Sequence, residues 1–550
     1  MLLSLDIQEK TVGTDKTLLK DCSLVIQENS KVGLIGRNGA GKTTLFNILS
    51  GNDTDFLGTI EQRRNLRVVL TKQEHFGTAS STPLQYVIDS LPRYAELTEI
   101  ITNFTEHPTS DPDDIQRFFA AQEEYTDRTY WNVSDHILES LGRYGISREQ
   151  AVAPFSLLSG GEKRFLELVR VSYADADLIL LDEPTNHMDY VGKAEFIRWL
   201  KDTKHSVCLI SHDRDVLNVV NEIVELKDQK LHRTPGNYAH YLKQNSTRTL
   251  TAVSSYEESL KLSEKLHNQW MLARVRKLKA KSDAGRNNAK TQELRFEKAY
   301  KELQATIDRP SFWIDKESVD ATKPKALEGY HKYKSKNIRI RPQELGEHTQ
   351  DLLTVEDLSL GYTEPLFDHI KFTLEHGSQV QLKGRNGAGK STLIQAILAA
   401  ALNTPLASTC YSGMITVNPK ARIGVYKQEV PEALLDLTLN EAVTKLYQDQ
   451  GLGITGDELR ALLGSYLFEP MRDGELQIRK LSGGQKARFQ LISMLSGKPN
   501  ILILDEPTNH LDLPSIEELE SALTGYEGAL LYVSHDSFFV NTIGGDVVEI

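Results

Sequence analysis

The sequence lacks the features of membrane and secreted proteins. None of its apolar runs approaches the ~20 residues that a membrane-spanning helix needs. Its start, MLLSLDIQEK, reaches an acid at Asp6 and has no basic segment before a long apolar core, so we expect no signal peptide. The three cysteines, Cys22, Cys208 and Cys410, are far apart, which argues against a disulfide framework or a zinc site. We expect them to be small buried side chains in a reducing cytoplasm.

Positive charge is scarce in the chain as a whole, which has 550 residues and a formal net charge of −12. This balance argues against a nucleic-acid-binding protein, but the distribution of charge matters more than its sum. Residues 261–290 hold nine basic and two acidic side chains, and residues 321–342 hold seven basic and one acidic. Such clusters bind phosphate backbones, although a solvated helix face would explain any single lysine.

Proline is absent from residues 244–308, where Gly285 is the only glycine. Leucines and long alkyl side chains recur there at helical spacing, as at Leu260, Leu266 and Trp270. The segment predicts two long helices joined near residues 282–290. We expect Trp270 to pack between these helices rather than to contact a ligand.

The most informative feature that is present is an internal duplication. GRNGAGKTTL begins at Gly36 and GRNGAGKSTL at Gly384, while LSGGEKRFLEL begins at Leu158 and LSGGQKARFQL at Leu481. The signature, Asp-Glu and Ser-His-Asp motifs all recur 323 residues apart and in the same order. In each copy, apolar runs of strand length alternate with helical stretches. The chain therefore predicts two α/β domains, each with a largely parallel buried sheet.

The two copies differ in length between two of these motifs. The interval from Gln73 to Leu158 exceeds that from Gln428 to Leu481 by 32 residues, and we place the insertion near residues 93–125. The resulting domains are a first α/β domain at 1–240, a basic helical linker at 241–345 and a second α/β domain at 350–550.

A phosphate-binding loop, GxxxxGK[ST], is matched at Gly36–Thr43 and at Gly384–Ser391. Its glycines let backbone N–H groups face phosphate oxygens, and the helix that follows presents its positive end. The lysine neutralises the β- and γ-phosphates, and the Thr or Ser places a hydroxyl on Mg²⁺. Two matches, each after an apolar strand, leave little room for a chance turn.

Further apolar runs end in Asp-Glu, at residues 182–183 and 505–506. The carboxyl ends of such strands are where open α/β sheets bind ligands. The Asp suits Mg²⁺ and the Glu can polarise an attacking water. His212 and His535 each follow another apolar strand, and their recurrence favours contact with a γ-phosphate over a structural role. In the signature motifs, Ser159 and Ser482 predict helix N-caps beside paired glycines that a phosphate can approach.

This combination resembles the ATP-binding cassette superfamily, whose two nucleotide-binding domains pair head to tail. The resemblance implies an ATPase with two composite sites, in which the signature of one copy closes over ATP and Mg²⁺ held by the other. The first site would comprise Gly36, Arg37, Asn38, Gly39, Ala40, Gly41, Lys42, Thr43, Thr44, Gln73, Asp182, Glu183 and His212, closed by Ser482, Gly483, Gly484 and Gln485. The second would comprise Gly384, Arg385, Asn386, Gly387, Ala388, Gly389, Lys390, Ser391, Thr392, Gln428, Asp505, Glu506 and His535, closed by Ser159, Gly160, Gly161 and Glu162.

The resemblance also assigns roles within these sites. The implied Mg²⁺ ligands are Thr43, Gln73 and Asp182 in the first site and Ser391, Gln428 and Asp505 in the second, with Glu183, Glu506, His212 and His535 as the catalytic residues. Tyr362 fits the aromatic that stacks on adenine in the second site, whereas Thr14 stands at the corresponding position of the first. A second departure is Glu162, which replaces the commoner glutamine of the signature.

Twin cassettes in one chain, without membrane spans and with a long basic linker, resemble the ABC-F family over nearly the whole sequence. This resemblance implies a cytoplasmic monomer, with its cassettes paired within the chain, that binds the ribosome. The linker would lie near the 23S rRNA of the peptidyl-transferase centre and the P-site tRNA, and the insertion would be the arm on the L1-stalk side. The implied RNA-binding residues are Arg274, Arg276, Lys277, Lys279, Lys281, Arg286 and Lys290.

The function we expect is ribosomal protection against antibiotics, with a translation regulator or rescue factor of the same family as the alternative. Two rivals come from other classes. An ATPase subunit of a transporter would work with a separate membrane partner. A DNA-handling cassette protein would carry zinc cysteines, or far longer coiled coils within one cassette.

Overall fold

The computed structural model describes residues 1–13, 16–71, 81–186, 188–306, 351–426, 430–509 and 511–550. The chain divides into two compact units, one made of Met1–Tyr238 and Ile340–Ile550 and the other of Ala239–Arg339. The first unit therefore holds both copies of the duplicated domain, and the second holds the segment between them. No helix in the described part of the chain is both long and apolar enough to cross a membrane.

The first copy is built on a six-stranded sheet whose strands follow the order β5-β6-β7-β3-β8-β9. Its strands are β3 (Lys31–Gly36), β5 (Val68–Leu70), β6 (Leu178–Asp182), β7 (Ser206–Ile210), β8 (Glu222–Lys227) and β9 (Lys230–Pro235). All neighbours pair in parallel except β8 and β9. Every residue of β6 and β7 is buried, as expected for strands covered on both faces. The predicted parallel buried sheet is confirmed.

Each copy also has an antiparallel three-stranded sheet that the sequence did not indicate. In the first copy it consists of β1 (Leu3–Val12), β2 (Lys16–Ile26) and β4 (Leu57–Gln62). In the second it consists of β10 (Asp351–Gly361), β11 (Pro365–Glu375) and β13 (Thr409–Val417). Buried residues of β1 and β2 share one apolar core with the P-loop helix α1 (Lys42–Leu49), so this sheet braces the P-loop.

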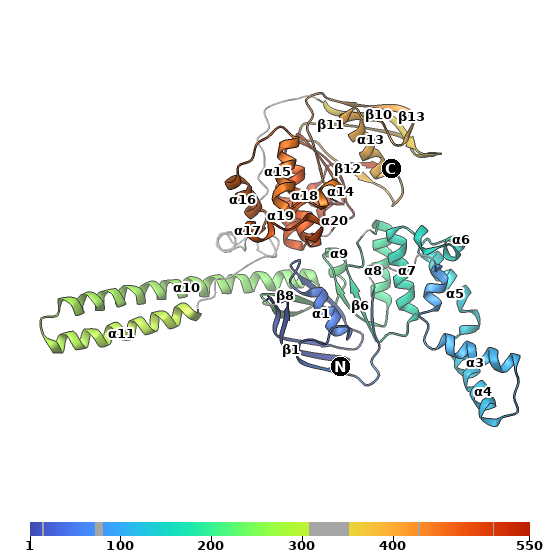
Figure 1. Ribbon diagram of the computed structural model, residues 1–550, viewed down its shortest axis with the longest axis horizontal. Coiled ribbons are helices and arrows are strands. Elements are labelled where there is room, and N and C mark those ends of the chain that lie inside the picture. The colour runs from blue at the N-terminus through green and yellow to red at the C-terminus, as the bar shows by residue number, and fades with distance from the viewer. Residues whose placement is uncertain (14–15, 72–80, 187, 307–350, 427–429, 510) are drawn as a thin grey trace. The chain divides into compact units, whose positions relative to one another are not determined.

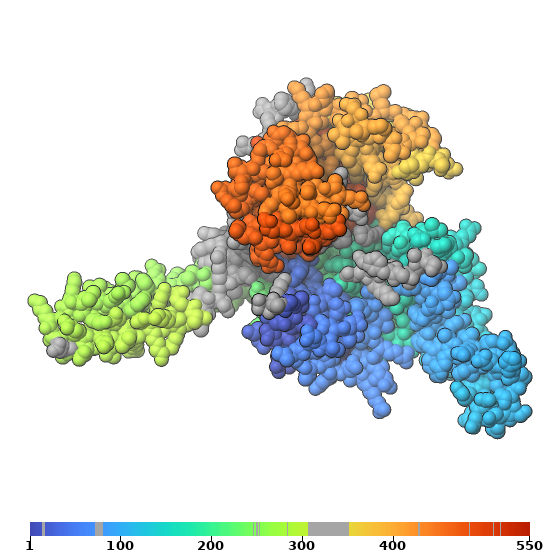
Figure 2. Space-filling model, in the orientation of Figure 1, coloured from blue at the N-terminus to red at the C-terminus, as the bar shows by residue number. Residues whose placement is uncertain are grey.

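Helices complete the first copy (Figure 1). They are α2 (Pro83–Ile88), α3 (Tyr94–Glu106), α4 (Pro112–Asp127), α5 (Val133–Arg143), α6 (Arg148–Val152), α7 (Gly160–Tyr173), α8 (Tyr190–Asp202) and α9 (Arg214–Leu217). Helices α3 and α4 pack on each other within the region proposed as an insertion, and Phe104 stacks on Phe118 between them. In the space-filling view this helical pair stands out from the rest of the first copy (Figure 2).

The second copy repeats the design with a five-stranded parallel sheet in the order β14-β15-β16-β12-β17. Its strands are β12 (Gln379–Lys383), β14 (Ile423–Tyr426), β15 (Ile501–Asp505), β16 (Ala529–Val533) and β17 (Asp546–Glu549). Its helices are α13 (Lys390–Leu402), α14 (Glu432–Leu435), α15 (Leu439–Asp449), α16 (Gly456–Ser465), α17 (Pro470–Asp473), α18 (Gly483–Leu495), α19 (Leu513–Thr524) and α20 (Ser537–Ile543).

The second unit is the predicted helical hairpin, formed by α10 (Tyr238–Lys279) and α11 (Asp283–Thr306) (Figure 1). The 42 residues of α10 span roughly 60 Å at the ~1.5 Å rise of an α-helix. Trp270 stacks on Tyr300 of α11 with ring centroids 5.9 Å apart, which confirms its predicted packing role. The basic segment at 321–342 lies outside the described residues.

Two predictions need correction. The turn of the hairpin lies at residues 280–282, earlier than expected, because Ser282 caps α11 by accepting a hydrogen bond from the N–H of Gly285 at 3.2 Å. Residues 283–290 are therefore helical. Cys22 and Cys208 are buried as predicted, but Cys410 is exposed because it lies on the edge strand β13.

A buried ion pair joins the two copies within the first unit. Arg214, which is 1% exposed, donates to Glu520 of α19 at 3.0 and 3.3 Å. The Arg214 guanidinium also lies over the ring of Phe538 at 5.3 Å. By the 323-residue offset, Ser537 occupies the position of Arg214 in the second copy and donates to Asp215 at 2.8 Å. The duplicated chain is thus held together by different chemistry at the two related positions.

Replacing Glu520 with Ala removes the carboxylate that accepts from the Arg214 guanidinium and leaves the longer contact of Nη2 with Glu517 Oε1, at 4.0 Å. Breaking a buried pair on one side costs about 3–5 kcal/mol, so the midpoint of thermal unfolding should fall by several degrees. The control is Asp457→Ala, which breaks an exposed pair with Arg460. Such surface pairs contribute about 0–1 kcal/mol, and equal midpoints for the two variants would contradict the role of Glu520.

Candidate nucleotide-binding sites

The two P-loops have nearly the same geometry. Gly41 and Gly389 precede the helices α1 and α13 with φ of 110° and 100°, in the left-handed region that glycine adopts without strain. A Cβ at Gly389 would lie 2.8 Å from the Phe367 ring, so a side chain is excluded there. Gly39 and Gly387 face open space, which leaves room for phosphate groups beside the loop.

The P-loop lysines are buried and held by the loop itself. Lys42 Nζ donates to the carbonyls of Gly36 at 2.6 Å and Arg37 at 3.2 Å. Lys390 Nζ donates to the carbonyls of Gly384 and Arg385, both at 2.8 Å. Burial lowers the pKa of both lysines, and nearby carboxylates act in the opposite direction. Each lysine is therefore a desolvated cation at the centre of its loop, as a phosphate site requires.

In both copies, the hydroxyl and the carboxylate that suit a divalent cation are hydrogen-bonded to each other. Thr43 Oγ1 donates to Asp182 Oδ2 at 3.0 Å, and Ser391 Oγ donates to Asp505 Oδ2 at 3.0 Å. Burial raises the pKa of both aspartates, and the hydroxyl and lysine partners lower it. A hydroxyl and a carboxylate at the end of a P-loop fit Mg²⁺, which prefers oxygen ligands. The predicted ligands Gln73 and Gln428 lie outside the described residues.

A Glu–His pair lies at the carboxyl ends of two neighbouring strands in each copy, β6 and β7 in the first and β15 and β16 in the second. Glu183 Oε1 lies 3.3 Å from His212 Nε2, and Glu506 Oε1 lies 3.3 Å from His535 Nε2. Both glutamates have φ near +50°, at 47° and 49°, which is strained for a residue with a side chain and typical of functional sites. The contact with the glutamate does not form a hydrogen bond, and the other described residues offer no hydrogen-bond partner to either histidine Nε2 atom, which suits side chains that bind a ligand.

Desolvation sets the protonation of these pairs in the ligand-free protein. Burial raises the pKa of Glu183 and of Glu506 to about 8, with the neighbouring aspartate also raising it and the P-loop lysine lowering it. Burial, aided by the P-loop lysine, lowers the pKa of His212 to about 3 and of His535 to about 4. The histidines are therefore neutral. The glutamates are largely protonated at neutral pH in the ligand-free protein, and a bound cation would have to lower their pKa before either could take a proton from water.

The signature serines are helix N-caps, as predicted. Ser159 Oγ accepts from the N–H of Glu162 at 3.3 Å, and Glu162 Oε2 accepts from the N–H of Ser159 at 2.7 Å. Ser482 and Gln485 form the same reciprocal pair at 3.0 and 3.3 Å. The unusual Glu162 therefore performs the capping that Gln485 performs, because the cap needs only an acceptor oxygen.

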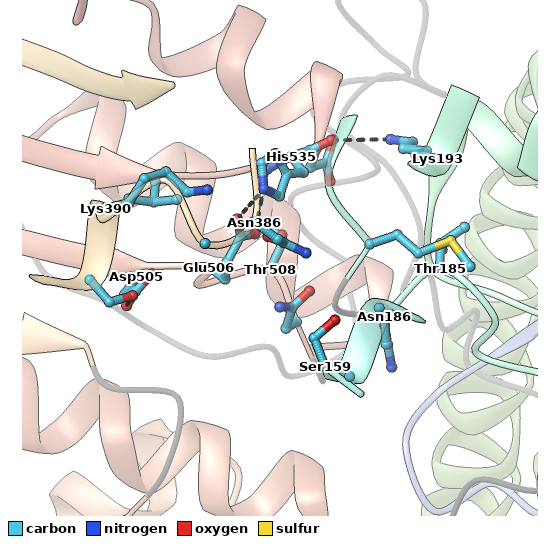
Figure 3. A pocket seen from close by; sticks show the side chains of 18 of the residues that line it. Ser159, Thr185, Asn186, Lys193, Asn386, Lys390, Asp505, Glu506, Thr508 and His535 are labelled. Atoms are coloured by element: carbon cyan, nitrogen blue, oxygen red, sulfur yellow. Dashed lines mark hydrogen bonds and ion pairs between the residues drawn. The ribbon is translucent and has the colours of Figure 1, made fainter. Parts of the chain in front are cut away.

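The second site opens into a cavity of about 570 Å³ that is shared by the two copies and also reaches Glu183 and His212 of the first site. Its walls carry Ser159, Gly160 and Gly161 of the first copy and Lys390, Ser391, Thr392, Asp505, Glu506 and His535 of the second. Figure 3 shows Ser159 and Asn186 on one side of this space and Lys390, Asp505 and Glu506 on the other. Tyr362 also lines the cavity and is 54% exposed, so its ring is available to a base. Thr14 lies outside the described residues.

The first site gathers Lys42, Thr43, Asp182, Glu183 and His212 in the same arrangement. A smaller cavity of about 140 Å³ next to its P-loop is lined by Arg37 and Asn38 together with residues of the second copy, among them Arg488 and Asp512.

Two aspartates join the copies at the P-loops, a role that motif reading did not assign. Asp512 Oδ2 accepts from the N–H of Asn38 at 3.1 Å, and Asp189 Oδ2 accepts from the N–H of Asn386 at 3.1 Å. Their other oxygens cap α19 and α8 by accepting from the N–H groups of Ser515 and Gly192. The sequence marks both aspartates, because each lies two residues after Thr-Asn-His in its copy. It does not reveal their partners, which are distant in sequence.

Comparisons with known proteins agree with these motifs. The family described as ABC transporter matches residues 19–186 and 367–509. The chain is 30% identical to ABC transporter F family member 5 of Arabidopsis thaliana, with 97% of this chain and 73% of the relative covered. It is also 30% identical to the ribosome protection protein VmlR of Bacillus subtilis, with coverage of 96% and 82%.

Solved structures share the fold. A crystal structure of the archaeal ribosome recycling factor aABCE1 with the ribosomal stalk protein aP1 superposes with a TM-score of 0.56 at 15% identity. The match covers 98% of this chain and 86% of that one. At this identity the likeness concerns the twin-cassette architecture alone.

The raised pKa of the two glutamates gives the ligand-free protein a distinct pH dependence. A carboxyl whose pKa is about 8 when folded, against about 4.5 when unfolded, releases its proton on unfolding at pH values between these limits, so stability falls as pH rises through this window. The variant Glu183→Gln, Glu506→Gln removes that loss. Its midpoint of thermal unfolding should exceed that of the parent by several degrees at pH 9, and by much less at pH 5.

The measurement needs EDTA and nucleotide-free protein, since a bound cation would alter both groups. The exposed pair Glu99→Gln, Glu106→Gln serves as the control and should show no pH-dependent gain. A gain that is the same at pH 5 and pH 9 would contradict the assignment.

Proposed function

Because the chain belongs to the ABC-F family of the ATP-binding cassette superfamily, we propose that it is an ATPase that binds the ribosome in its ATP-bound state and leaves after hydrolysis. The single observation that carries the catalytic part is the shared cavity, in which the signature of the first copy faces the P-loop, Glu506 and His535 of the second. A site built from both copies makes their closure dependent on the nucleotide between them.

Each group has a defined task in this proposal. Lys390 and the P-loop N–H groups would hold the phosphates. The Ser391–Asp505 pair would hold Mg²⁺, which would withdraw charge from the phosphate oxygens. Glu506 takes a proton from the attacking water, and neutral His535 donates a hydrogen bond toward the γ-phosphate. Ser159 and the start of α7 supply donors from the other side. The first site uses Lys42, Thr43, Asp182, Glu183 and His212 in the same way, closed by the signature of the second copy.

The hairpin offers a surface suited to nucleic acid. Arg274, Arg276, Lys279, Lys281, Arg286 and Lys290 are all exposed on α10, α11 and the turn between them. Lys277 differs, because its Nζ pairs with Glu293 of α11 at 2.8 Å and it is only partly exposed. We therefore assign Lys277 to the hairpin packing and the six exposed cations to phosphate contacts in 23S rRNA and the P-site tRNA.

Ribosomal protection is the finer function we propose, and the likeness to the ribosome protection protein VmlR supports it. The chain would displace or exclude an antibiotic at the peptidyl-transferase centre through its hairpin. The arm at α3 and α4 would contact the ribosome separately. The protein would act as a monomer in the cytoplasm, with its cassettes paired within one chain.

Ribosome binding is tested by co-sedimentation of the variant Glu183→Gln, Glu506→Gln. Removing both carboxylates should lower hydrolysis by at least ~100-fold while leaving ATP binding intact, so the closed state accumulates. We expect the variant to pellet with ribosomes in ATP but not in ADP. Absence of pelleting in both nucleotides would overturn ribosome binding and direct attention to a membrane partner.

The role of the hairpin is tested in the same variant by neutralising Arg274, Arg276, Lys279 and Lys281 with Gln. Loss of four phosphate contacts should weaken binding by at least ~100-fold at physiological salt and lower its salt dependence. The matched control neutralises Lys298 and Lys301, which pair with glutamates on α11. Equal pelleting of both charge variants would contradict an RNA contact at the turn.

Ribosomal protection is tested by expressing the wild-type chain in a susceptible strain and measuring inhibitory concentrations of antibiotics that bind the large subunit. A several-fold rise that is lost in the Glu183→Gln, Glu506→Gln variant is expected. Unchanged inhibitory concentrations with intact ribosome binding would favour the translation-factor alternative.

A further inference from the structure

A buried polar network in the first copy connects its signature helix to the segment that leads into α3 and α4. Glu167 lies two turns into α7 and is 2% exposed. Its carboxylate accepts from Arg170 Nε at 3.2 and 3.3 Å and from Arg170 Nη2 at 2.9 Å. The hydroxyl of Tyr86, on α2, donates to the same carboxylate.

Tyr86 also contacts the chain on the other side of the signature. Its ring meets the ring of Phe155 edge-on with centroids 5.4 Å apart. The N–H of Phe155 donates to the carbonyl of Ser81 at 3.0 Å, just before α2. Phe155 precedes Ser159 by four residues and Glu167 follows it by eight, so α2 contacts the chain on both sides of the signature serine.

The catalytic roles assigned above do not use this network. The guanidinium of Arg170 lies over the Tyr86 ring at 5.9 Å and its Nη2 reaches the carbonyl of Leu70 at 3.5 Å. A buried carboxylate with a bidentate arginine and a phenol is costly to assemble, and an apolar cluster would pack α2 on α7 as well. Such networks fix one geometry rather than add stability.

The second copy lacks the network at the corresponding positions. By the 323-residue offset, Gln490 stands for Glu167 and Ser493 for Arg170. In each copy a threonine caps the helix that packs on the signature helix: Thr82 caps α2 and Thr438 caps α15. The fourth residue after the cap is Tyr86 in α2 but Ala442 in α15, so the second copy has no tyrosine at this position. Gln490 is buried, and its Oε1 meets no hydrogen-bond partner among the described residues. The network therefore occurs only in the copy that carries α3 and α4.

We propose that Tyr86, Glu167 and Arg170 are positioning residues that couple α2, and with it the α3–α4 pair, to Ser159 and so control closure of the second nucleotide site. Five residues separate the end of α2 from the start of α3, so displacement of the α3–α4 pair pulls on the element that carries Tyr86. The rigid triad transmits that displacement to the N-terminus of α7. Closure at Lys390 and Glu506 then responds to the arm, while closure at Lys42 and Glu183 does not. This inference rests on the composite sites of the proposed function.

The test measures how long each site retains ATP. Glu506→Gln traps ATP at the second site and Glu183→Gln traps it at the first. Radiolabelled ATP that remains bound after rapid gel filtration gives a half-life for each. Adding Tyr86→Phe removes one hydrogen bond to a carboxylate and should shorten the half-life about tenfold in the Glu506→Gln background, with less than a twofold change in the Glu183→Gln background.

Two further variants separate positioning from folding. Tyr526→Phe removes a hydroxyl that donates to the carbonyl of Pro499 at 2.8 Å, and it should alter neither half-life. Glu167→Gln should shorten the half-life at the second site as Tyr86→Phe does, and the double variant should add little more, because both act through one network.

The outcomes distinguish the two proposals. If Glu506→Gln alone traps no ATP, the composite-site proposal fails and this inference with it. If both single variants trap ATP but Tyr86→Phe shortens the two half-lives equally, or neither, the coupling is overturned while the composite sites stand. Thermal unfolding of Tyr86→Phe is measured alongside, and a lower midpoint with an unchanged half-life at the second site would also overturn it.

Discussion

The hydrogen bonds that Asp189 and Asp512 accept from the opposite P-loops are the contacts on which the paired architecture depends. Each aspartate caps a helix with one oxygen and holds a backbone N–H of the other copy with the second oxygen. A P-loop is therefore never anchored by its own domain alone. Each of these hydrogen bonds links a phosphate-binding loop to the start of α8 or α19, next to the Asp-Glu motif of the other site.

Desolvation sets the pKa values of the Glu and His side chains near these contacts. The same burial that raises the pKa of Glu183 and Glu506 lowers that of His212 and His535, so each pair holds a neutral imidazole beside a carboxyl that is largely protonated at neutral pH. The strained φ of both glutamates shows that the fold, rather than local preference, places them there. A bound cation and phosphates would replace the missing solvation, which ties the working charge state to occupancy.

The two copies repeat a design but not its details. Arg214 of the first copy forms a buried ion pair with Glu520, whereas Ser537, at the related position of the second copy, donates a hydrogen bond to Asp215. Tyr86, Glu167 and Arg170 are replaced by other residues at the corresponding positions of the second copy. The second site opens into a large cavity with an aromatic at its edge. The two sites therefore share their catalytic residue types, but the residues that pack around them differ.

The sequence by itself determined the α/β class, the duplication, both P-loops, the Asp-Glu strands, the capped signatures and the helical hairpin. These features depend on short-range rules, since strand burial, glycine φ and helix capping are readable within a few residues. It also indicated the family, because several motifs recur together in one order. The early turn at Ser282 and the exposed Cys410 were missed because a capping side chain and an edge strand are local exceptions to the wider pattern.

Only the tertiary structure decided which distant side chains meet. No spacing predicts that Asp512 reaches Asn38, that Glu520 neutralises Arg214 or that Tyr86 bonds Glu167, because each contact joins elements brought together by packing of separate sheets and helices. The same holds for Lys277, whose charge suggested RNA until its partner on α11 was placed. Charge and motif are properties of sequence, whereas the partner that satisfies a buried polar group is a property of the fold.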